Sequence, residues 1–271
     1  MSFARSVMWI TLAIMRATII TIANQKGGTG KTTTAVNLAA GLALNDRKVV
    51  LIDMDPQAHS TSHLGVSEPD VTIEDVMAGR SKAREATYET PMKNLFLIAS
   101  ATSLSVFEAN IVREVGNEFI LRESLESLTS YVDFILIDCP PSLDVLTVNA
   151  LSASHFVYIA TQSEYFALDG VAKLRKTMAT IQKRINPTLQ LGGIILTMHS
   201  KRMKHHLQAL RMLEDSFPGQ VCETPIRRNV KLADASSHGQ PIQMYDPHST
   251  GAHDYNLLAR EVMERCTSVR T

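Results

Sequence analysis

Two lysines stand five residues apart in one glycine-rich segment of this chain. The segment reads Ala-Asn-Gln-Lys-Gly-Gly-Thr-Gly-Lys-Thr-Thr-Thr over residues 23–34, and its lysines are Lys26 and Lys31. Its Gly-Lys-Thr closes the phosphate-loop pattern G-x-x-x-x-G-K-[ST], but Gln25 stands where that pattern has its first glycine. One lysine is enough to cradle the phosphates of a nucleotide, so the second lysine needs an explanation of its own.

The chemistry expected of this segment is the binding of a nucleoside triphosphate. Glycines let the backbone curl, so that its N–H groups face phosphate oxygens, and the start of a following helix adds unpaired donors. We expect Lys31 to reach the β- and γ-phosphates and the hydroxyl of Thr32 to hold Mg²⁺. The expected nucleotide contacts in the loop are Gly27, Gly28, Thr29, Gly30, Lys31, Thr32 and Thr33.

Three aspartates lie at or just after the ends of apolar runs. Asp53 ends residues 48–53, with Asp55 two positions later, and Asp138 ends residues 132–138. Asp138 has the placement of the acid that holds Mg²⁺ through water beside a phosphate loop. Asp55 either caps the turn before a proline or orients and deprotonates the water that attacks the γ-phosphate. Asp53 either assists Mg²⁺ or only ends its strand.

Apolar segments rich in β-branched residues alternate with helical segments along the chain. Expected strands lie at residues 17–23, 48–53, 94–99, 132–138, 155–160 and 189–197, with a weak seventh at 220–224. Expected helices lie at residues 32–45, 72–78, 103–129, 143–152, 167–185, 204–217 and 250–266. This alternation predicts an α/β fold: a doubly wound, mostly parallel sheet flanked by helices, with ligands at the carboxyl ends of the strands. The loop and the aspartates fall at such ends, so one site is expected.

The composition indicates a soluble globular protein. The 271 residues include 27 Lys and Arg against 27 Asp and Glu, which excludes a globally basic nucleic-acid binder but not a local basic patch. Three cysteines without a C-x-x-C pair indicate reduced thiols in a cytoplasm. We expect a single domain over residues 17–271, preceded by an extension over residues 1–16 that is disordered or not native.

With these pieces in place, the chain resembles the ParA/Soj partition ATPases, within the deviant Walker A group of phosphate-loop NTPases that includes MinD. The matching blocks are residues 24–34, 51–57, 136–143, 162–170 and 228–239. The resemblance implies a slow ATPase that uses ATP and Mg²⁺ and forms a sandwich dimer with ATP. It also implies nonspecific DNA binding and a ParB-like adaptor that stimulates hydrolysis. Together these would place the protein on the nucleoid of a bacterial cytoplasm, where it positions a chromosome, a plasmid or another large cargo.

The same resemblance implies roles for individual residues. Lys26 would reach across the dimer interface to the nucleotide of the other subunit, which accounts for the second lysine. Asp55 matches the catalytic acid of the family and Asp138 its Walker B aspartate. Catalysis would therefore rest on Lys26, Lys31 and Asp55.

Two positions depart from the family pattern. Asn229 matches a residue near the adenine, but Arg227 occupies the position of a proline, so the adenine pocket is expected to differ there. Asp144 replaces a glycine of the family. Neither change touches a residue expected to contact phosphate.

The C-terminal half carries a local excess of basic residues, which is either a solvated charged face or a DNA-binding surface. The candidates for DNA contact are Lys201, Arg202, Lys204, Arg211, Arg228 and Lys231. One alternative is a MinD-like membrane-associated ATPase, with the apolar residues 7–15 as its anchor. Membrane targeting is less favoured, because the C-terminal segment 257–266 mixes acids with its bases. A further alternative is a nucleotide-switched scaffold without turnover.

Overall fold

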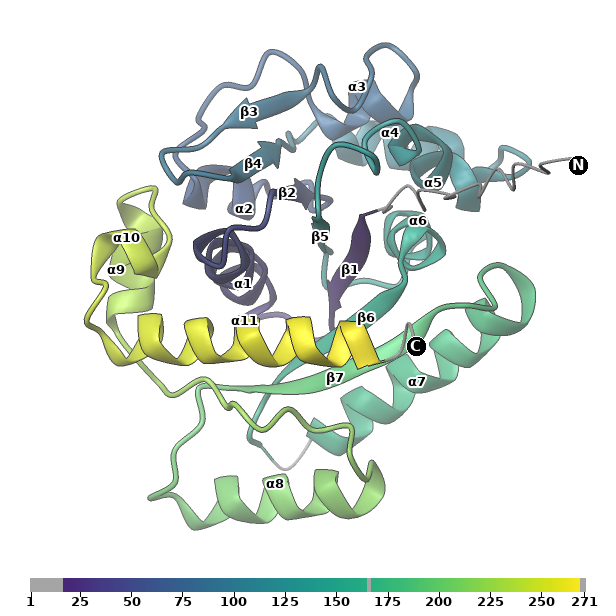
Figure 1. The fold of residues 1–271 in the computed structure, drawn as a ribbon. Helices are drawn as coiled ribbons and strands as arrows, with labels where there is room; N and C mark the ends of the chain where they lie inside the picture. Colours follow the sequence, from purple (N-terminus) through teal and green to yellow (C-terminus); the bar gives the residue numbers. More distant parts are fainter. Residues whose placement is uncertain (1–16, 165–166, 269–271) are drawn as a thin grey trace, which may run out of the picture.

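The computed structural model describes residues 17–164 and 167–268, whose strands form one seven-stranded sheet (Figure 1). The strands are β1 (Thr18–Ala23), β2 (Val49–Asp53), β3 (Thr87–Glu89), β4 (Leu95–Ile98), β5 (Phe134–Asp138), β6 (Phe156–Gln162) and β7 (Gln190–Thr197). Their order in the sheet is β3-β4-β2-β5-β1-β6-β7. Every pair is parallel except β3 with β4, which is antiparallel. The predicted α/β architecture with a mostly parallel sheet is thereby confirmed.

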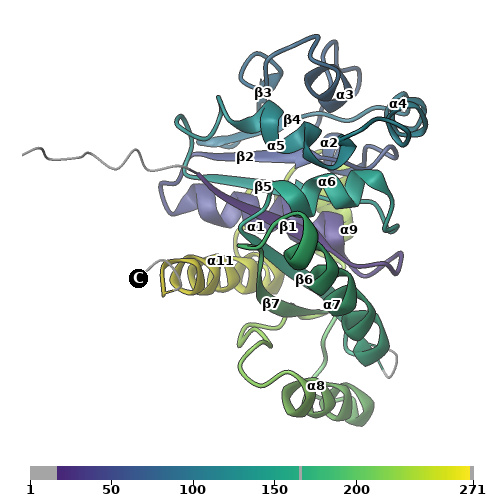
Figure 2. The ribbon, with the colours of Figure 1, turned by 90° about the vertical axis from the view of Figure 1, so that its right-hand side faces the viewer.

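Helices cover both faces of this sheet, which explains why the central strands are apolar at almost every position. The helices are α1 (Lys31–Leu44), α2 (His59–His63), α3 (Ile73–Met77), α4 (Leu104–Ile111), α5 (Ile120–Leu125), α6 (Val145–Ala153), α7 (Ala167–Arg184), α8 (Lys204–Ser216), α9 (Lys231–Ser237), α10 (Ile242–Tyr245) and α11 (Thr250–Ser268). One face packs against α1 and α11. The other packs against α3 to α6 and, beside β6 and β7, against α7 and α8 (Figures 1 and 2).

Two expected elements are wrong. The single helix expected at 103–129 is divided into α4, a 3₁₀ turn at Asn117–Phe119 and α5. The division falls at Gly116, whose positive φ of 79° ends helical geometry, and the side chain of Asn149 bonds to backbone groups just beyond it. The expected strand at 220–224 makes only an isolated bridge, Ile194 with Val221, because prolines lie close on both sides of it.

Several short elements were not expected from the sequence. They are the edge strand β3 and the helices α2, α9 and α10. The extension at residues 1–16 lies outside the described residues. Within the ranges 17–164 and 167–268, no helix is long and apolar enough to cross a bilayer.

Candidate active site

Two strands on one side of β1, namely β6 and β7, hold the glycine-rich loop in place. Asn24 follows β1 and donates its side-chain amide to the carbonyl of Ala160 in β6 (2.7 Å), while its Oδ1 accepts the backbone N–H of Lys26 (3.1 Å). Thr197 at the end of β7 donates its hydroxyl to the carbonyl of Thr29 (2.7 Å). These bonds hold the loop at the carboxyl edge of the sheet, where α1 begins.

Two of the loop glycines have backbone conformations that other residues rarely adopt. Gly28 has a φ of 71° and Gly30 a φ of 83°. Gly30 immediately precedes α1, so this left-handed turn lies where the first N–H groups of the helix are unpaired. The expected strand, loop and helix arrangement of a phosphate-binding site is therefore present.

Lys31 is the first residue of α1 and points back under the loop. It is only 7% exposed, and its Nζ donates to the carbonyl of Lys26 (3.3 Å). Burial lowers the pKa of Lys31, while the nearby Asp138, Cys139 and Asp55 act to raise it. A phosphate above the loop would compensate the desolvation of this ammonium group.

Asp53 and Asp138 stand side by side at the carboxyl ends of adjacent strands. They are register partners in the β2–β5 pair, and both are fully buried. Burial raises the pKa of each carboxyl group, and the charge of Asp53 raises that of Asp138 further. The nearby hydroxyls of Thr32 and Ser60 and the charge of Lys31 act in the opposite direction on Asp138. Two buried acids this close need a cation to remain ionised together.

The two acids differ in what their oxygens already bind. Asp53 Oδ1 accepts the N–H of Asp55 (3.1 Å), and its Oδ2 accepts both the N–H and the hydroxyl of Thr61 (2.8 Å each). Asp138 Oδ2 accepts the hydroxyl of Ser60 (2.8 Å), but its buried Oδ1 has no hydrogen-bond partner among the described residues. Asp53 thus fastens the segment that follows β2, whereas Asp138 keeps a free oxygen next to the loop.

That free oxygen fits a bound divalent cation. Carboxylate and hydroxyl oxygens are the ligands that Mg²⁺ uses in proteins, and Thr32 supplies a hydroxyl near Asp138. The described part of the chain contains no group of three or more His, Cys, Asp or Glu that could hold a metal ion. A cation here would need ligands from phosphate and water as well, as Mg²⁺ usually has.

Asp55 lies in the turn after β2 and is 8% exposed. Its Oδ1 accepts the N–H of Gln57 (3.0 Å), and its carbonyl accepts the hydroxyl of Ser100 (2.8 Å). The turn-capping role expected as one alternative is therefore present. These bonds also fix the direction of the carboxylate, which a catalytic acid requires, so the two expected roles are compatible.

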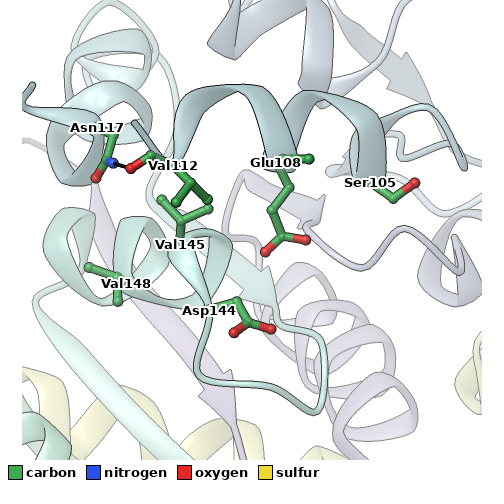
Figure 3. A pocket seen from close by; sticks show the side chains of 8 residues that line it. Ser105, Glu108, Val112, Asn117, Asp144, Val145 and Val148 are labelled. Atoms are coloured by element: carbon green, nitrogen blue, oxygen red, sulfur yellow. Dashed lines mark hydrogen bonds between the residues drawn. The ribbon is translucent and has the colours of Figure 1, made fainter. Parts of the chain in front are cut away.

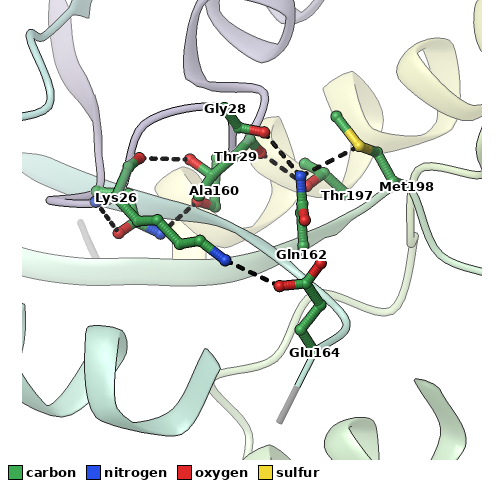
Figure 4. A network of polar contacts seen from close by, with 9 residues as sticks. Lys26, Gly28, Thr29, Ala160, Gln162, Glu164, Thr197 and Met198 are labelled. Atoms are coloured by element: carbon green, nitrogen blue, oxygen red, sulfur yellow. Dashed lines mark hydrogen bonds and ion pairs between the residues drawn. The ribbon is translucent and has the colours of Figure 1, made fainter. Parts of the chain in front are cut away.

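The side chain of Lys26, the second lysine, points toward Glu164 (Figure 4). Its Nζ lies 2.8 Å from Oε2 of Glu164, just beyond the end of β6, and the two side chains are 56% and 45% exposed. Gln162 steadies the loop nearby, donating its amide to the carbonyl of Gly28 (2.7 Å). Lys26 is therefore held at the surface and is not directed into the site of its own chain.

A pocket of about 490 Å³ opens beside the loop, within the usual size range of small-molecule sites. Its lining includes Gly30, Thr33, Thr197, Ile226, Arg227, Arg228, Asn229, Leu232 and Tyr255. The guanidinium of Arg227 is engaged by the buried carboxylate of Asp254, with Nε–Oδ2 at 2.9 Å. Asn229 donates its amide to the hydroxyl of Thr250 (3.0 Å). The pocket thus continues the phosphate loop toward the residues expected near an adenine.

A second hollow, of about 520 Å³, lies between α4 and α6 (Figure 3). Two carboxylates, Glu108 and Asp144, line it together with Val112, Val145 and Val148. Burial raises the pKa of Glu108, and the charges of Asp144 and Asp55 raise it further. In the sequence, Asp144 is visible only as a departure from the family pattern and Glu108 gives no signal, because nothing local in the sequence pairs the two residues.

The six candidates for DNA contact divide into two groups. Lys201, Arg202, Lys204 and Arg211 are exposed on α8 or in the segment before it. The other two lie at or next to the pocket beside the loop. Arg228 lines it, and Lys231 stands between the lining residues Val230 and Leu232 and pairs with Asp234 (3.4 Å). The structure therefore does not gather all six on one element.

Comparison with known proteins gives consistent results. Residues 17–191 match the family model described as an AAA domain. The chain is 43% identical to the chromosome-partitioning ATPase Soj of Treponema pallidum over 242 residues, 89% of this chain and 95% of that protein. It is 41% identical to the chromosome partitioning protein ParA of Myxococcus xanthus over 251 residues, 92% of this chain and 89% of that protein.

Two solved structures are similar throughout. Cobyrinic acid a,c-diamide synthase from Mycobacterium smegmatis, with bound ADP and magnesium, has a TM-score of 0.82 and 31% identity, and the match covers 93% of this chain and 96% of that one. The septum site-determining protein MinD of Pyrococcus horikoshii, complexed with Mg-ADP, has a TM-score of 0.76 and 28% identity, covering 91% and 96%.

Proposed function

The chain belongs to the ParA/Soj family of partition ATPases, and from this membership we propose that it hydrolyses ATP to drive a cycle between a monomer and a DNA-bound dimer. A phosphate-loop ATPase that uses ATP and Mg²⁺ is the part that the family relationship itself supports. The observation that carries the rest is the different placement of two lysines in one loop. Lys31 is buried against the acids, and Lys26 is held at the surface.

The phosphates of ATP would lie over residues 27–33, with Lys31 beneath them and the adenosine in the pocket that contains Asn229. Thr32 and Asp138 are the residues we assign to Mg²⁺, which when bound neutralises phosphate charge. The free Oδ1 of Asp138 supports this assignment. We assign Asp53 to positioning, because all its bonds fasten the segment that carries Asp55.

Hydrolysis would begin with a water molecule oriented by Asp55. This carboxylate is held by the N–H of Gln57 and lies close enough to Lys31 to influence its pKa. In this class of enzyme catalysis is mostly positioning and electrostatics, so the unassisted rate is expected to be slow. A partner that completes the site would raise that rate, and we propose a ParB-like adaptor with a basic segment.

Dimerisation would follow from Lys26. A lysine that is exposed in its own chain can contact the ATP of a second copy, and each copy then completes the site of the other. Because this contact exists only when ATP is bound, ATP binding would favour the dimer. The dimer doubles every basic surface, so DNA affinity would follow the nucleotide state.

We propose that the protein acts on the nucleoid of a bacterial cytoplasm, where it segregates a chromosome, a plasmid or another large cargo. A MinD-like membrane ATPase remains the alternative reading, favoured by the similarity to MinD of P. horikoshii. The two differ in which anionic surface the ATP-bound form recognises.

The test is to compare DNA and membrane binding of the same protein in three nucleotide states. With ATPγS, duplex DNA of random sequence should bind, and vesicles containing anionic phospholipid should not sediment the protein. With ADP or without nucleotide, DNA binding should fall at least tenfold. Vesicle binding without DNA binding would support the MinD-like alternative. Zero ATP turnover even in the presence of both DNA and the partner would instead indicate a nucleotide-switched scaffold.

A further inference from the structure

Helix α7 carries a strip of basic side chains that is not among the expected DNA contacts. We propose that this strip, the α7 basic face formed by Lys173, Lys176, Lys183 and Arg184, binds the phosphate backbone of duplex DNA. The inference rests on the proposed DNA-bound state and names a part of the protein that makes the contact.

The four residues fall on one side of the helix. Their spacing of i, i+3, i+10 and i+11 places them within about a third of a turn of each other at roughly 3.6 residues per turn. All four are exposed, whereas the opposite side of the helix is buried against the core. The buried residues are Ala167, Val171, Leu174, Met178 and Ile181. The basic face therefore points to solvent along its whole length.

Among the described residues, no carboxylate forms an ion pair with these four side chains. Asp169 in the first turn is the only acidic residue of α7. Elsewhere on the surface the contrast is clear, since Arg80 contacts both Glu74 and Asp75. A surface of unpaired cations attracts a polyanion, and this attraction is strongest where several cations share one line.

The α7 basic face adjoins the basic residues already expected to contact DNA. Helices α7 and α8 pack against each other, and both views show them side by side at one end of the molecule (Figures 1 and 2). Lys204 and Arg211 are exposed on α8. From Lys173 to Arg184 the helix rises roughly 16 Å, a length over which duplex DNA carries about ten phosphates. Two neighbouring helices can thus contact a longer stretch of backbone than α8 alone.

The start of α7 also lies next to the nucleotide loop. Gly170 faces the side chain of Asn24, and Glu164, which precedes the helix, holds Lys26. The α7 basic face therefore lies at a fixed position relative to the loop at which the dimer would form. Recognition would depend on phosphate and be independent of base sequence, because long flexible lysines contact phosphate as point charges.

The experiment measures the affinity of the full chain for a short duplex by fluorescence anisotropy, with ATPγS, over a series of NaCl concentrations. The test variant is K173Q/K176Q/K183Q/R184Q. The matched control is R47Q/K48Q/K93Q/R122Q, which also removes four exposed basic side chains. These residues lie just before β2, just before β4 and in α5, whereas α7 lies beside β6 and β7 at the opposite end of the sheet. Both variants should keep the ATPγS affinity and the dimer fraction of the unmodified chain, which checks that they fold.

The test variant should bind DNA at least tenfold more weakly, and the slope of log K against log salt should become shallower by about 2 or more per dimer. The control variant should change the slope by less than about 1. Equal affinity and equal slope in the two variants would overturn the inference. The inference would also be overturned if the test variant bound DNA as the unmodified chain does but bound anionic vesicles less well. If the unmodified chain binds no DNA with ATPγS, both the proposed DNA-bound state and this inference fall.

Discussion

Lys26 and Glu164 form an ion pair within one chain, with Nζ and Oε2 at 2.8 Å. The lysine belongs to the phosphate loop and the glutamate follows β6, so the pair joins segments that are 138 residues apart in sequence. Both side chains are about half exposed, which limits the stabilisation to roughly 0.2–1 kcal/mol. A contact this weak can be exchanged for a stronger partner, such as the phosphates bound to a second subunit.

We therefore predict that Glu164→Gln strengthens the ATP-dependent dimer. The substitution releases Lys26 in the monomer without changing the loop, so the dimer dissociation constant should fall roughly two- to fivefold. Sedimentation velocity over a range of protein concentrations with ATPγS measures this. Glu118→Gln, an acid without a described ion pair, is the control and should leave the constant unchanged. A weaker dimer in Glu164→Gln would mean that Glu164 acts within the dimer interface instead.

The two lysines should separate nucleotide binding from dimerisation. Lys31→Ala removes the buried ammonium group beneath the phosphates and should weaken ATP binding by more than tenfold. Lys26→Ala should bind ATP within about threefold of the unmodified chain but form no dimer. Titration with a fluorescent ATP analogue measures binding, and light scattering after gel filtration measures the oligomeric state. Loss of dimers without loss of binding in Lys31→Ala would reverse the assignment.

Substitution of Asp55 should block hydrolysis and preserve ATP binding. Asp55→Ala removes the group assigned to the attacking water, and turnover should fall by a factor of about 10² or more. ATP would then persist, so the variant should accumulate as a dimer that stays on DNA after excess ATP is removed. The rate of phosphate release and the lifetime on immobilised DNA are the measurements. Normal turnover in Asp55→Ala would exclude it as the group that activates water.

Much of this site was predictable from the sequence because its signals are local. A β-branched run before a glycine-rich turn indicates the strand and loop around Lys31, and an apolar strand that ends in Asp138 indicates where its carboxylate lies. Parallel strands then bring these ends to one edge, although they are far apart in sequence. The main features of the fold followed from the same alternation of strands and helices.

The parts that sequence reasoning missed depend on contacts between distant segments. Nothing near Glu164 or Ser60 signals that one holds Lys26 and the other Asp138. The prediction of one helix at 103–129 is wrong for a similar reason. The segment is interrupted by a turn whose backbone groups form hydrogen bonds with the distant side chain of Asn149. Gly41 likewise looks like an unfavourable residue within a good helix, and only the packing of α11 accounts for it.

Gly41 gives a prediction about stability. A Cβ at this position would lie 2.8 Å from Ala259 Cβ and 3.0 Å from the carbonyl oxygen of Tyr255, both in α11. Gly41→Ala should therefore lower the free energy of unfolding by about 1–3 kcal/mol, despite the better helix propensity of alanine. Gly170→Ala in α7 is the control, because its Cβ would meet only Asn24 Oδ1 at 3.8 Å. Urea unfolding of both variants measures the difference, and equal stability would show that α1 and α11 can separate at little cost.

The stability of the protein without nucleotide should depend on pH through Asp138. Burial and the charge of Asp53 raise the pKa of Asp138 in the folded protein above its value in the unfolded chain. The folded state therefore retains a proton that the unfolded state has lost, so the contribution of this group to stability is full at low pH. That contribution is lost as the pH rises from about 4 toward neutrality.

Asp138→Asn removes this titration while keeping the shape of the side chain and an oxygen for the hydroxyl of Ser60. At pH 8 and without nucleotide, the variant should be more stable than the unmodified chain by on the order of 2 kcal/mol, and the gap should narrow toward pH 4. Burial lowers the pKa of His63 to about 4, so the contribution of His63 to stability is lost as the pH falls. This effect is the same in both proteins and does not change the difference between them. Urea unfolding from pH 4 to pH 8 measures the difference. With Mg²⁺ and ATP the unmodified chain should be the more stable of the two, because only the aspartate gains from a bound cation. If Asp138→Asn is instead less stable at every pH without nucleotide, the charge of Asp138 is already stabilised by other groups of the chain.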